Sequence, residues 1–298
     1  MGKTTEISVA QNTNKSKLAL FAELAKVRLS FLVVFSAVMA FMLGWTGIID
    51  WTKILWLVSG GFFITAASNT INQIIEKDLD KLMSRTKGRP LPTGQLSLVE
   101  AAIFAGTTGI LGIFILSYFF NPLSGVLGAL SLISYAFIYT PSKRLSPISV
   151  FVGAIPGSMP LLIGWTAATG AISIEGVVLF GIQFFWQIPH FWSIAWLLNE
   201  DYEKAGFKLL PSSNGKTRMT ALQNIPYLLM LILSGTFPYV LGMAGKASLL
   251  ISLIAGFYFL FQGVQLTIDT KDKSARRLMF ASFIYLPVVF LAYVIDKI

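Results

Sequence analysis

The sequence predicts an all-α integral membrane protein with nine transmembrane helices, and three observations support this. Of the 298 residues, 55% are hydrophobic and only 12% are charged, a balance outside the range of soluble domains. Nine apolar stretches are each about as long as a helix needs to cross the hydrocarbon core of a bilayer. Lysine and arginine gather in alternate connections between these stretches, as in a multi-pass membrane protein.

The chain opens with a polar segment. We expect residues 1–20 to form a mobile cytoplasmic tail, since they lack the apolar core of a signal peptide, and residues 21–298 to form a single transmembrane domain. A short helix at the membrane surface is expected at Leu18–Val27. The predicted transmembrane helices are 29–48, 54–75, 98–120, 123–141, 148–169, 174–197, 225–244, 247–267 and 278–296.

The basic residues predict the orientation of the chain. The N-terminal segment and the connections after the second, fourth, sixth and eighth predicted helices hold 20 of the 23 lysines and arginines. This places the N-terminus in the cytoplasm and the C-terminus outside, and we expect a bacterial inner membrane. The net charge of +9 then fits anionic lipid head groups better than nucleic acid. The absence of cysteine excludes disulfides, thiolate metal ligands and cysteine nucleophiles.

A polar stretch after the second predicted helix, Asn69–Gly94, reads NTINQIIEKDLDKLMSRTKGRPLPTG. Asn72, Glu76 and Asp80 are spaced four and four, which places their side chains on one face of a helix. Carboxylates at a membrane boundary are costly unless a cation neutralises them. Mg²⁺ usually binds one or two carboxylates together with substrate phosphates. We therefore predict a Mg²⁺ site on these three residues.

Basic residues follow in the same stretch. Lys81, Arg85 and Arg89 can meet the negative charge of a phosphate or diphosphate. The alternative is a solvated cytoplasmic loop whose bases only set the topology. The shared face of the amide and the two carboxylates favours a binding site.

Two further clusters lie at the same predicted membrane face. In YTPSKR, at the end of the fourth predicted helix, Tyr139, Lys143 and Arg144 can bind a diphosphate, although bases often snorkel at a membrane edge. After the sixth predicted helix come two acids and a base, Glu200, Asp201 and Lys204. If the second and sixth helices are neighbours, the two acidic groups face each other and hold metal ions that bridge one diphosphate. The alternative is an ordinary helix end with solvated acids.

His190 is the only histidine, and it lies inside an apolar predicted helix after Pro189. A histidine at membrane depth needs a partner. Three roles are open: a ligand of haem iron, a base, or a hydrogen bond to a neighbouring helix. The adjacent Phe191 and Trp192 offer aromatic faces to a flat ligand, and Pro189 is expected to kink the helix.

Together these motifs resemble the UbiA superfamily of intramembrane prenyltransferases, and most closely its haem O synthase branch. The resemblance covers roughly residues 20–295, with the motifs in the same order. It departs from the superfamily's first motif where Gln73 and Glu76 replace aspartates. The motifs that carry it are Asn72/Glu76/Asp80, SRTKGRPLPTG, YTPSKR, GAIPGSMPLLIGW, WQIPHFW and NEDYEKAGFKLLP.

The resemblance implies a helical bundle around a central cavity open to the cytoplasmic side. It implies transfer of a farnesyl group from farnesyl diphosphate to a vinyl group of haem b, with addition of water, giving haem o for terminal oxidases. Mg²⁺ is the implied cofactor, and the implied partners are the bilayer and a terminal oxidase assembly factor or haem A synthase. The implied catalytic residues are Asn72, Glu76, Asp80 and His190.

Two other functions are compatible with parts of the pattern. A secondary transporter for an anionic lipid also places polar groups in broken helices, but here the polar groups collect at one membrane face. A prenyltransferase that acts on a quinone or chlorophyll precursor would share the diphosphate motifs. The IPHFW sequence around His190 favours haem as the acceptor.

Overall fold

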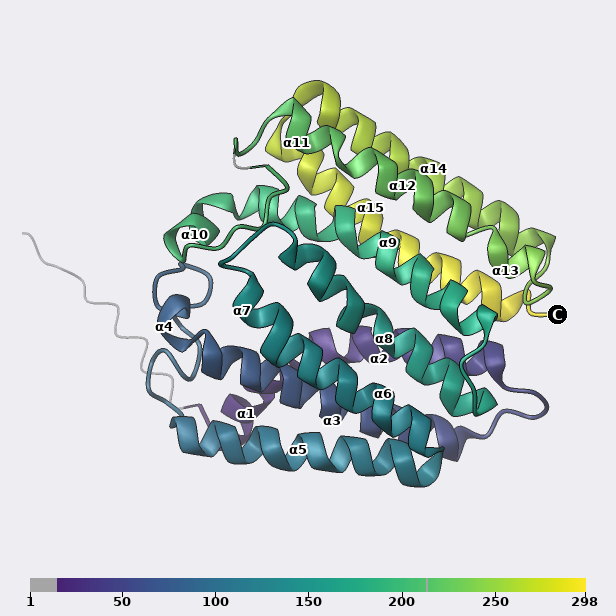
Figure 1. Cartoon of the computed structure of the whole chain (residues 1–298), viewed down its shortest axis with the longest axis horizontal. Helices are drawn as coiled ribbons and strands as arrows, with labels where there is room; N and C mark the ends of the chain where they lie inside the picture. Colours follow the sequence, from purple (N-terminus) through teal and green to yellow (C-terminus); the bar gives the residue numbers. More distant parts are fainter. Residues whose placement is uncertain (1–14, 213) are drawn as a thin grey trace, which may run out of the picture.

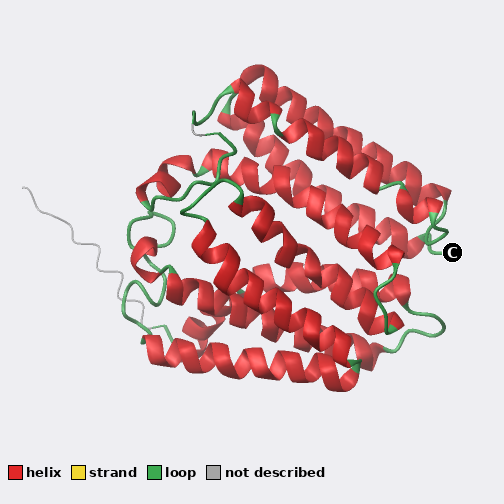
Figure 2. Cartoon of the chain, in the orientation of Figure 1, coloured by secondary structure: helices red, strands yellow, loops and turns green. Residues whose placement is uncertain are grey.

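A computed structural model describes residues 15–212 and 214–298. Across these residues every regular element is a helix, and the only β pairing is one isolated bridge between Ala244 and Lys297. Figure 2 shows the helices running roughly alongside one another, with the loops at the two ends of the bundle and the longer ones at one end. The all-α class predicted from composition is confirmed.

Nine helical spans within the described ranges are long and apolar enough to cross a membrane, as predicted. Seven are single helices, and two are composite. The single ones are α2 (Val27–Gly44), α3 (Trp51–Ile75), α5 (Leu98–Phe119), α8 (Ser149–Thr169), α9 (Ile174–Leu197), α14 (Lys246–Asp269) and α15 (Asp272–Ile295). The composite ones are α6 (Pro122–Ile133) with η1 (Ser134–Tyr139) and α7 (Thr140–Ser142), and α11 (Arg218–Leu222) with α12 (Asn224–Ser234) and α13 (Phe237–Val240).

The short helices lie at the end of the bundle where the basic loops gather (Figure 1). They are α1 (Lys17–Ala25), α4 (Lys77–Asp80) and α10 (Asn199–Lys204). Helix α1 occupies most of the range predicted for a surface helix. Of the predicted tail, residues 1–14 lie outside the described residues.

The boundaries differ most where charged residues continue a helix beyond its apolar part. Helix α15 begins at Asp272, six residues before the predicted start, because a charged helical turn is stable in water although it lowers the local hydropathy. The seventh span is interrupted near Gly235, and the short α13 begins at Phe237, with Pro238 in its first turn. Elsewhere the sequence marks the helix starts clearly: Ser97 and Glu100 form a capping box at α5.

The two largest clusters of the core share α2 and α8. One cluster joins these helices to α9, α12, α14 and α15, and the other joins them to α3, α5 and α6. Figure 1 shows α2 and α8 in the middle of the bundle, between these two sets. Close approach of the two central helices needs a glycine, because a Cβ on Gly164 would lie 1.9 Å from the carbonyl oxygen of Ala37. The seam between the clusters is therefore where the helices enclose a cavity.

Candidate functional site

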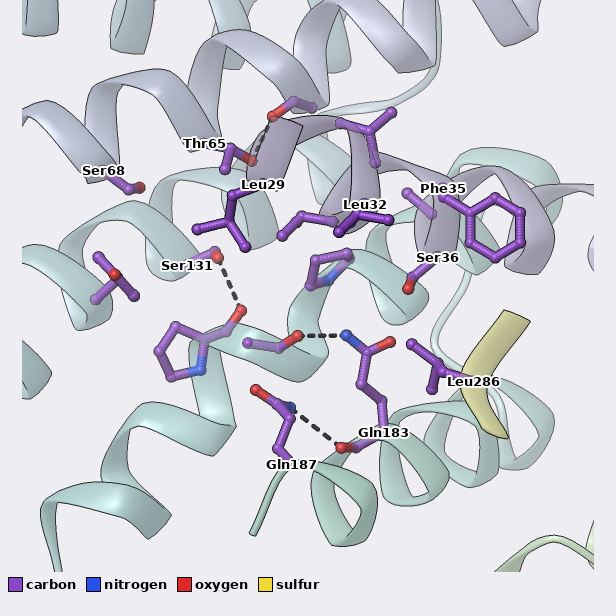
Figure 3. Close-up of a pocket in the computed structure, with 18 of the residues that line it drawn as sticks. Leu29, Leu32, Phe35, Ser36, Thr65, Ser68, Ser131, Gln183, Gln187 and Leu286 are labelled. Atoms are coloured by element: carbon purple, nitrogen blue, oxygen red, sulfur yellow. Dashed lines mark hydrogen bonds between the residues drawn. The ribbon is translucent and has the colours of Figure 1, made fainter. Parts of the chain in front are cut away.

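A cavity of about 270 Å³ lies at this seam. Its walls come from α2, α3, α6, η1, α8, α9 and α15 and are mostly apolar. Figure 3 shows side chains of α2, such as Leu29 and Leu32, across the cavity from Gln183 and Gln187 of α9. That it opens to the cytoplasmic side stays a prediction.

Glu76 and Asp80 lie where α3 ends, beside this cavity, and each is paired with a base. Helix α3 stops at Glu76 and resumes at once as α4, with the Asp80 amide donating to the Glu76 carbonyl over 2.8 Å. Lys143 Nζ lies 2.8 Å from Glu76 Oε1, and Arg89 Nη1 lies 2.7 Å from Asp80 Oδ2. The structure thus brings together two acids and two bases from the three predicted motif segments 72–80, 84–94 and 139–144.

Burial sets the electrostatics of these pairs. Asp80 is fully buried, and burial raises the pKa of its carboxyl above the usual value although Arg89 opposes the shift. Burial disfavours the charge of Lys143, but the Glu76 carboxylate, together with Tyr135 and Tyr202, more than offsets this, and the Lys143 pKa is raised overall. The Lys143 ammonium lies over the ring of Tyr139, 4.8 Å from its centroid.

The fourth span widens into a π-helix, η1, just before these residues. Such a segment turns the following side chains onto a new face and is frequent at functional sites. Thr140, the first residue of α7 after η1, accepts a hydrogen bond from Asn72 Nδ2 over 3.2 Å, so the fourth span meets α3 here. Tyr139 packs against Gly153, where any Cβ would lie 2.5 Å from its ring. Glycine in the GAIPGSMPLLIGW segment therefore makes room for this tyrosine.

The remaining predicted polar residues lie around this centre. Lys81 pairs with Asp78 at the surface, and the side chains of Arg85, Arg144 and Lys204 are exposed. None of these four makes an ion pair with Glu76 or Asp80 in the structure.

The predicted second acidic pair does not join the first in the structure. Asp201 accepts hydrogen bonds from Ser84 Oγ over 2.6 Å and from the Arg85 amide over 3.3 Å. The Ser84 hydroxyl and the Lys204 ammonium hold the pKa of Asp201 down, to about 2. Glu200 is exposed. Asp201 therefore ties α10 to the loop after α4, and its predicted role as a metal ligand stays a prediction.

His190 is buried and lines the cavity. Its Nδ1 lies 2.7 Å from Ser282 Oγ of α15, and its ring stacks on Trp186 with centroids 4.7 Å apart. Phe191 also lines the cavity. Trp192 does not, because it faces the other side of α9 and packs against Phe151 and Tyr227. Of the two aromatic residues, only Phe191 lines the cavity, and the contact of Trp192 with a flat ligand stays a prediction.

Several site residues were missed in the sequence. Gln183 and Gln187 line the cavity beside His190, and Gln187 donates to Ser158; their spacing of four within an apolar helix was a usable signal. Lys26 connects α1 to α2 in a left-handed conformation. Burial, helped by nearby cations including Arg89, lowers its pKa to about 7. Only the fold shows that Lys26 approaches the ion pairs.

The donor set fits a divalent cation. Asp80 Oδ1 is buried and has no hydrogen-bond partner among the described residues, so a carboxylate oxygen is left for another ligand. The same residues contain no cluster of three or more His, Cys, Asp or Glu side chains able to hold a metal alone. Two carboxylates and the Asn72 amide suit Mg²⁺, which takes its other ligands from water and phosphate.

Comparison with known proteins places the chain among described families. The UbiA prenyltransferase family matches residues 33–286. A protein named protoheme IX farnesyltransferase from Cytophaga hutchinsonii is 46% identical over 283 residues, which are 95% of this chain and 99% of that protein.

Two solved structures share the fold. One, from work on digeranylgeranylglyceryl phosphate synthase in membranes, has a TM-score of 0.78 at 22% identity and covers 94% of this chain and 98% of its own. The other, a UbiA homolog from Archaeoglobus fulgidus bound to DMAPP and Mg²⁺, has a TM-score of 0.66 at 16% identity over 92% and 98% of the two chains.

The buried pair of Glu76 and Lys143 yields a stability prediction. Lys143→Met leaves the Glu76 carboxylate buried without a cation, so we expect it to lower the free energy of unfolding by about 3–5 kcal/mol. The double variant with Glu76→Gln removes the unpaired charge and should lose less. Denaturant unfolding in detergent measures both.

The matched control is Lys81→Met, which removes a lysine whose partner Asp78 is exposed. Exposed pairs contribute at most about 1 kcal/mol. A loss no larger in Lys143→Met than in Lys81→Met would contradict the importance of the buried pair.

Proposed function

The chain belongs to the UbiA prenyltransferase family, and from this membership we propose how its residues transfer a farnesyl group from farnesyl diphosphate to haem b, with addition of water, to give haem o and diphosphate. It is a multi-pass membrane protein and a protoheme IX farnesyltransferase by its likeness to curated relatives. The observation that carries the residue assignments is an apolar cavity with the sole histidine on its wall. The buried ion pairs lie next to it, because the Lys143 ammonium of one pair lies over the ring of Tyr139, which lines the cavity.

The charged end binds the diphosphate. In the structure Arg89 and Lys143 neutralise Asp80 and Glu76. A diphosphate that enters the site is a second anion that these two bases can bind. The same bases stabilise the negative charge that develops on the diphosphate as it leaves. The Tyr139 ring lies beneath the Lys143 ammonium, and its hydroxyl can donate a hydrogen bond to the diphosphate. We assign the outer bases Lys81, Arg85, Arg144 and Lys204 to attraction of the anionic head group.

Asn72, Glu76 and Asp80 would hold Mg²⁺, with Glu200 and Asp201 as further candidates. The ion, when bound, supplies positive charge that stabilises the leaving diphosphate. The buried Asp80 Oδ1, which has no hydrogen-bond partner in the described part of the chain, supports this assignment.

The apolar wall suits the remaining chemistry. Loss of diphosphate leaves an allylic cation, which aromatic faces stabilise and an apolar cavity protects from early capture by water. The haem vinyl group then attacks the farnesyl carbon, and water adds to the second cation. His190 lies on this wall, where it either ligates haem iron or accepts a proton. Phe191 packs beside it.

We further propose that the ion-pair end faces the cytoplasm, since the basic loops collect there, with the N-terminus inside and the C-terminus outside. Both greasy substrates then enter from the bilayer. The product is passed to a haem-modifying or oxidase assembly partner.

The first prediction concerns Asp80. Asp80→Ala should abolish formation of haem o from haem b and farnesyl diphosphate in membranes, because it removes the acid with a free buried oxygen. Omission of Mg²⁺ should abolish it in the wild type. Chromatography of the extracted haems measures both.

Asp78→Ala is the matched control, since Asp78 is two residues away and exposed. It should keep near-normal activity. If Asp80→Ala, shown by unfolding to be intact, also keeps it, the metal assignment fails.

The second prediction separates the two substrates. Arg89→Gln and Lys143→Gln should weaken farnesyl diphosphate binding more than haem binding, because each removes a charge from the diphosphate end. Separate titrations with the two ligands measure this. A larger fall in haem affinity would assign these bases to the porphyrin propionates instead.

The third prediction concerns His190. His190→Ala should lower activity whether the imidazole ligates iron or acts as a base, but only ligation predicts a changed Soret band in the haem-loaded protein. Phe283→Leu controls for lost packing against the ring, since Phe283 contacts the His190 ring, with centroids 5.1 Å apart, and has no ligating atom. It should leave the Soret band close to that of the wild type. An unchanged Soret band in His190→Ala would exclude ligation.

A further inference from the structure

Ser282 of α15 contacts the histidine face of α9 at two points. Its hydroxyl oxygen lies 2.7 Å from His190 Nδ1. Its backbone carbonyl accepts a hydrogen bond from Trp186 Nε1 over 2.8 Å. Trp186 and His190 are one helical turn apart, so one residue of α15 holds both. Ser282 itself is fully buried.

The hydrogen atoms around Ser282 can be assigned by counting donors. Ser282 Oγ lies 2.5 Å from the carbonyl oxygen of Met279. A carbonyl only accepts, and a serine hydroxyl has one hydrogen to donate. That hydrogen therefore goes to Met279, and the Ser282 oxygen is left to accept. The contact with His190 then requires a hydrogen on Nδ1.

This assignment determines the other ring nitrogen. A neutral imidazole carries one hydrogen, so Nε2 holds a free lone pair when Nδ1 is protonated. Nε2 makes no hydrogen bond to the residues that the structure describes, and His190 lines the cavity. Trp186 stacks on one side of the ring and Phe283 meets it edge-on, which fixes the plane of the imidazole.

We propose that Ser282 is a positioning residue that holds His190 as the Nδ1–H tautomer and presents its Nε2 lone pair to the substrate cavity. This proposal rests on the proposed function only for the group that the lone pair binds, which is haem iron or a proton. A neutral hydroxyl suits the task, because a carboxylate in its place would favour a charged imidazolium. Loss of such an outer partner typically lowers metal affinity about 10- to 100-fold.

The test uses the fact that His190 is the only histidine. The full chain, purified without a polyhistidine tag and labelled with ¹⁵N-histidine, gives nitrogen resonances from one imidazole. Wild-type protein without haem should show a protonated Nδ1 and an unprotonated Nε2. Ser282→Ala should shift the population toward the Nε2–H tautomer, and Ser282→Thr, which keeps the hydroxyl, should restore the wild-type spectrum.

Ser274→Ala is the matched control, because Ser274 is a buried serine of the same helix, two turns before Ser282, whose hydroxyl donates to Asp269 and not to the groups around His190. It should leave the imidazole resonances unchanged. An Nε2–H tautomer in the wild type would overturn the proposal even if Ser282→Ala does not fold. An unchanged tautomer in a folded Ser282→Ala protein would also overturn it.

A haem titration of the same variants separates this proposal from the assignment of His190. If Nε2 ligates iron, Ser282→Ala should weaken haem b binding about 10-fold or more, and Ser282→Thr should restore it. The other outcome is a shifted tautomer in Ser282→Ala, with haem binding and the Soret band unchanged in both Ser282→Ala and His190→Ala. In that case Ser282 positions the imidazole, and the assignment of His190 as an iron ligand is wrong.

Discussion

Two carboxylates buried at the edge of an apolar bundle are the constraint on which the rest of this site depends. Glu76 and Asp80 cannot keep their charge in such surroundings without a cation close by. The cations come from elsewhere in the chain: Arg89 from the loop after α4, and Lys143 from the end of the fourth span. Each pair therefore fixes a segment that has little regular structure of its own against the end of α3.

The same constraint explains why the charged end is ready for an anionic substrate. The bases that neutralise the acids are already desolvated and held in place, so binding a diphosphate does not require them to be ordered first. Asp80 retains one buried oxygen that makes no hydrogen bond to residues 15–212 or 214–298. The two carboxylates are thus each paired with a base, but one carboxylate oxygen is still available to a ligand, as expected of a site that binds a metal ion and phosphates.

The apolar part of the cavity depends on hydrogen bonds between neighbouring helices. Gln183, Gln187 and His190 are polar groups at membrane depth, and each finds a partner on a neighbouring helix: Gly157, Ser158 and Ser282. These bonds join α9 to α8 on one side and to α15 on the other. Because α9 is held from both sides, the histidine has a fixed orientation in the wall of the cavity where the two helix clusters meet.

The sequence alone determined the features that depend on local pattern. Hydropathy and length predicted nine spans, and helical spacing placed Glu76 and Asp80 on one face. The basic motifs lie at one predicted membrane face, and this predicted Arg89 and Lys143 as diphosphate ligands. It predicted the exposed Arg85 and Arg144 equally. The motifs were also specific enough to indicate the family.

Only the tertiary structure decided which residues meet. Asp201 bonds to Ser84, 117 residues away in the sequence, and Trp192 packs against Tyr227. Lys26 and Ser282 lie at the site, although no motif around either residue predicts it. A helical period fixes which residues share a face, but packing between distant helices fixes what that face touches. That packing is set by close approaches such as Gly164 on Ala37, which depend on the whole bundle.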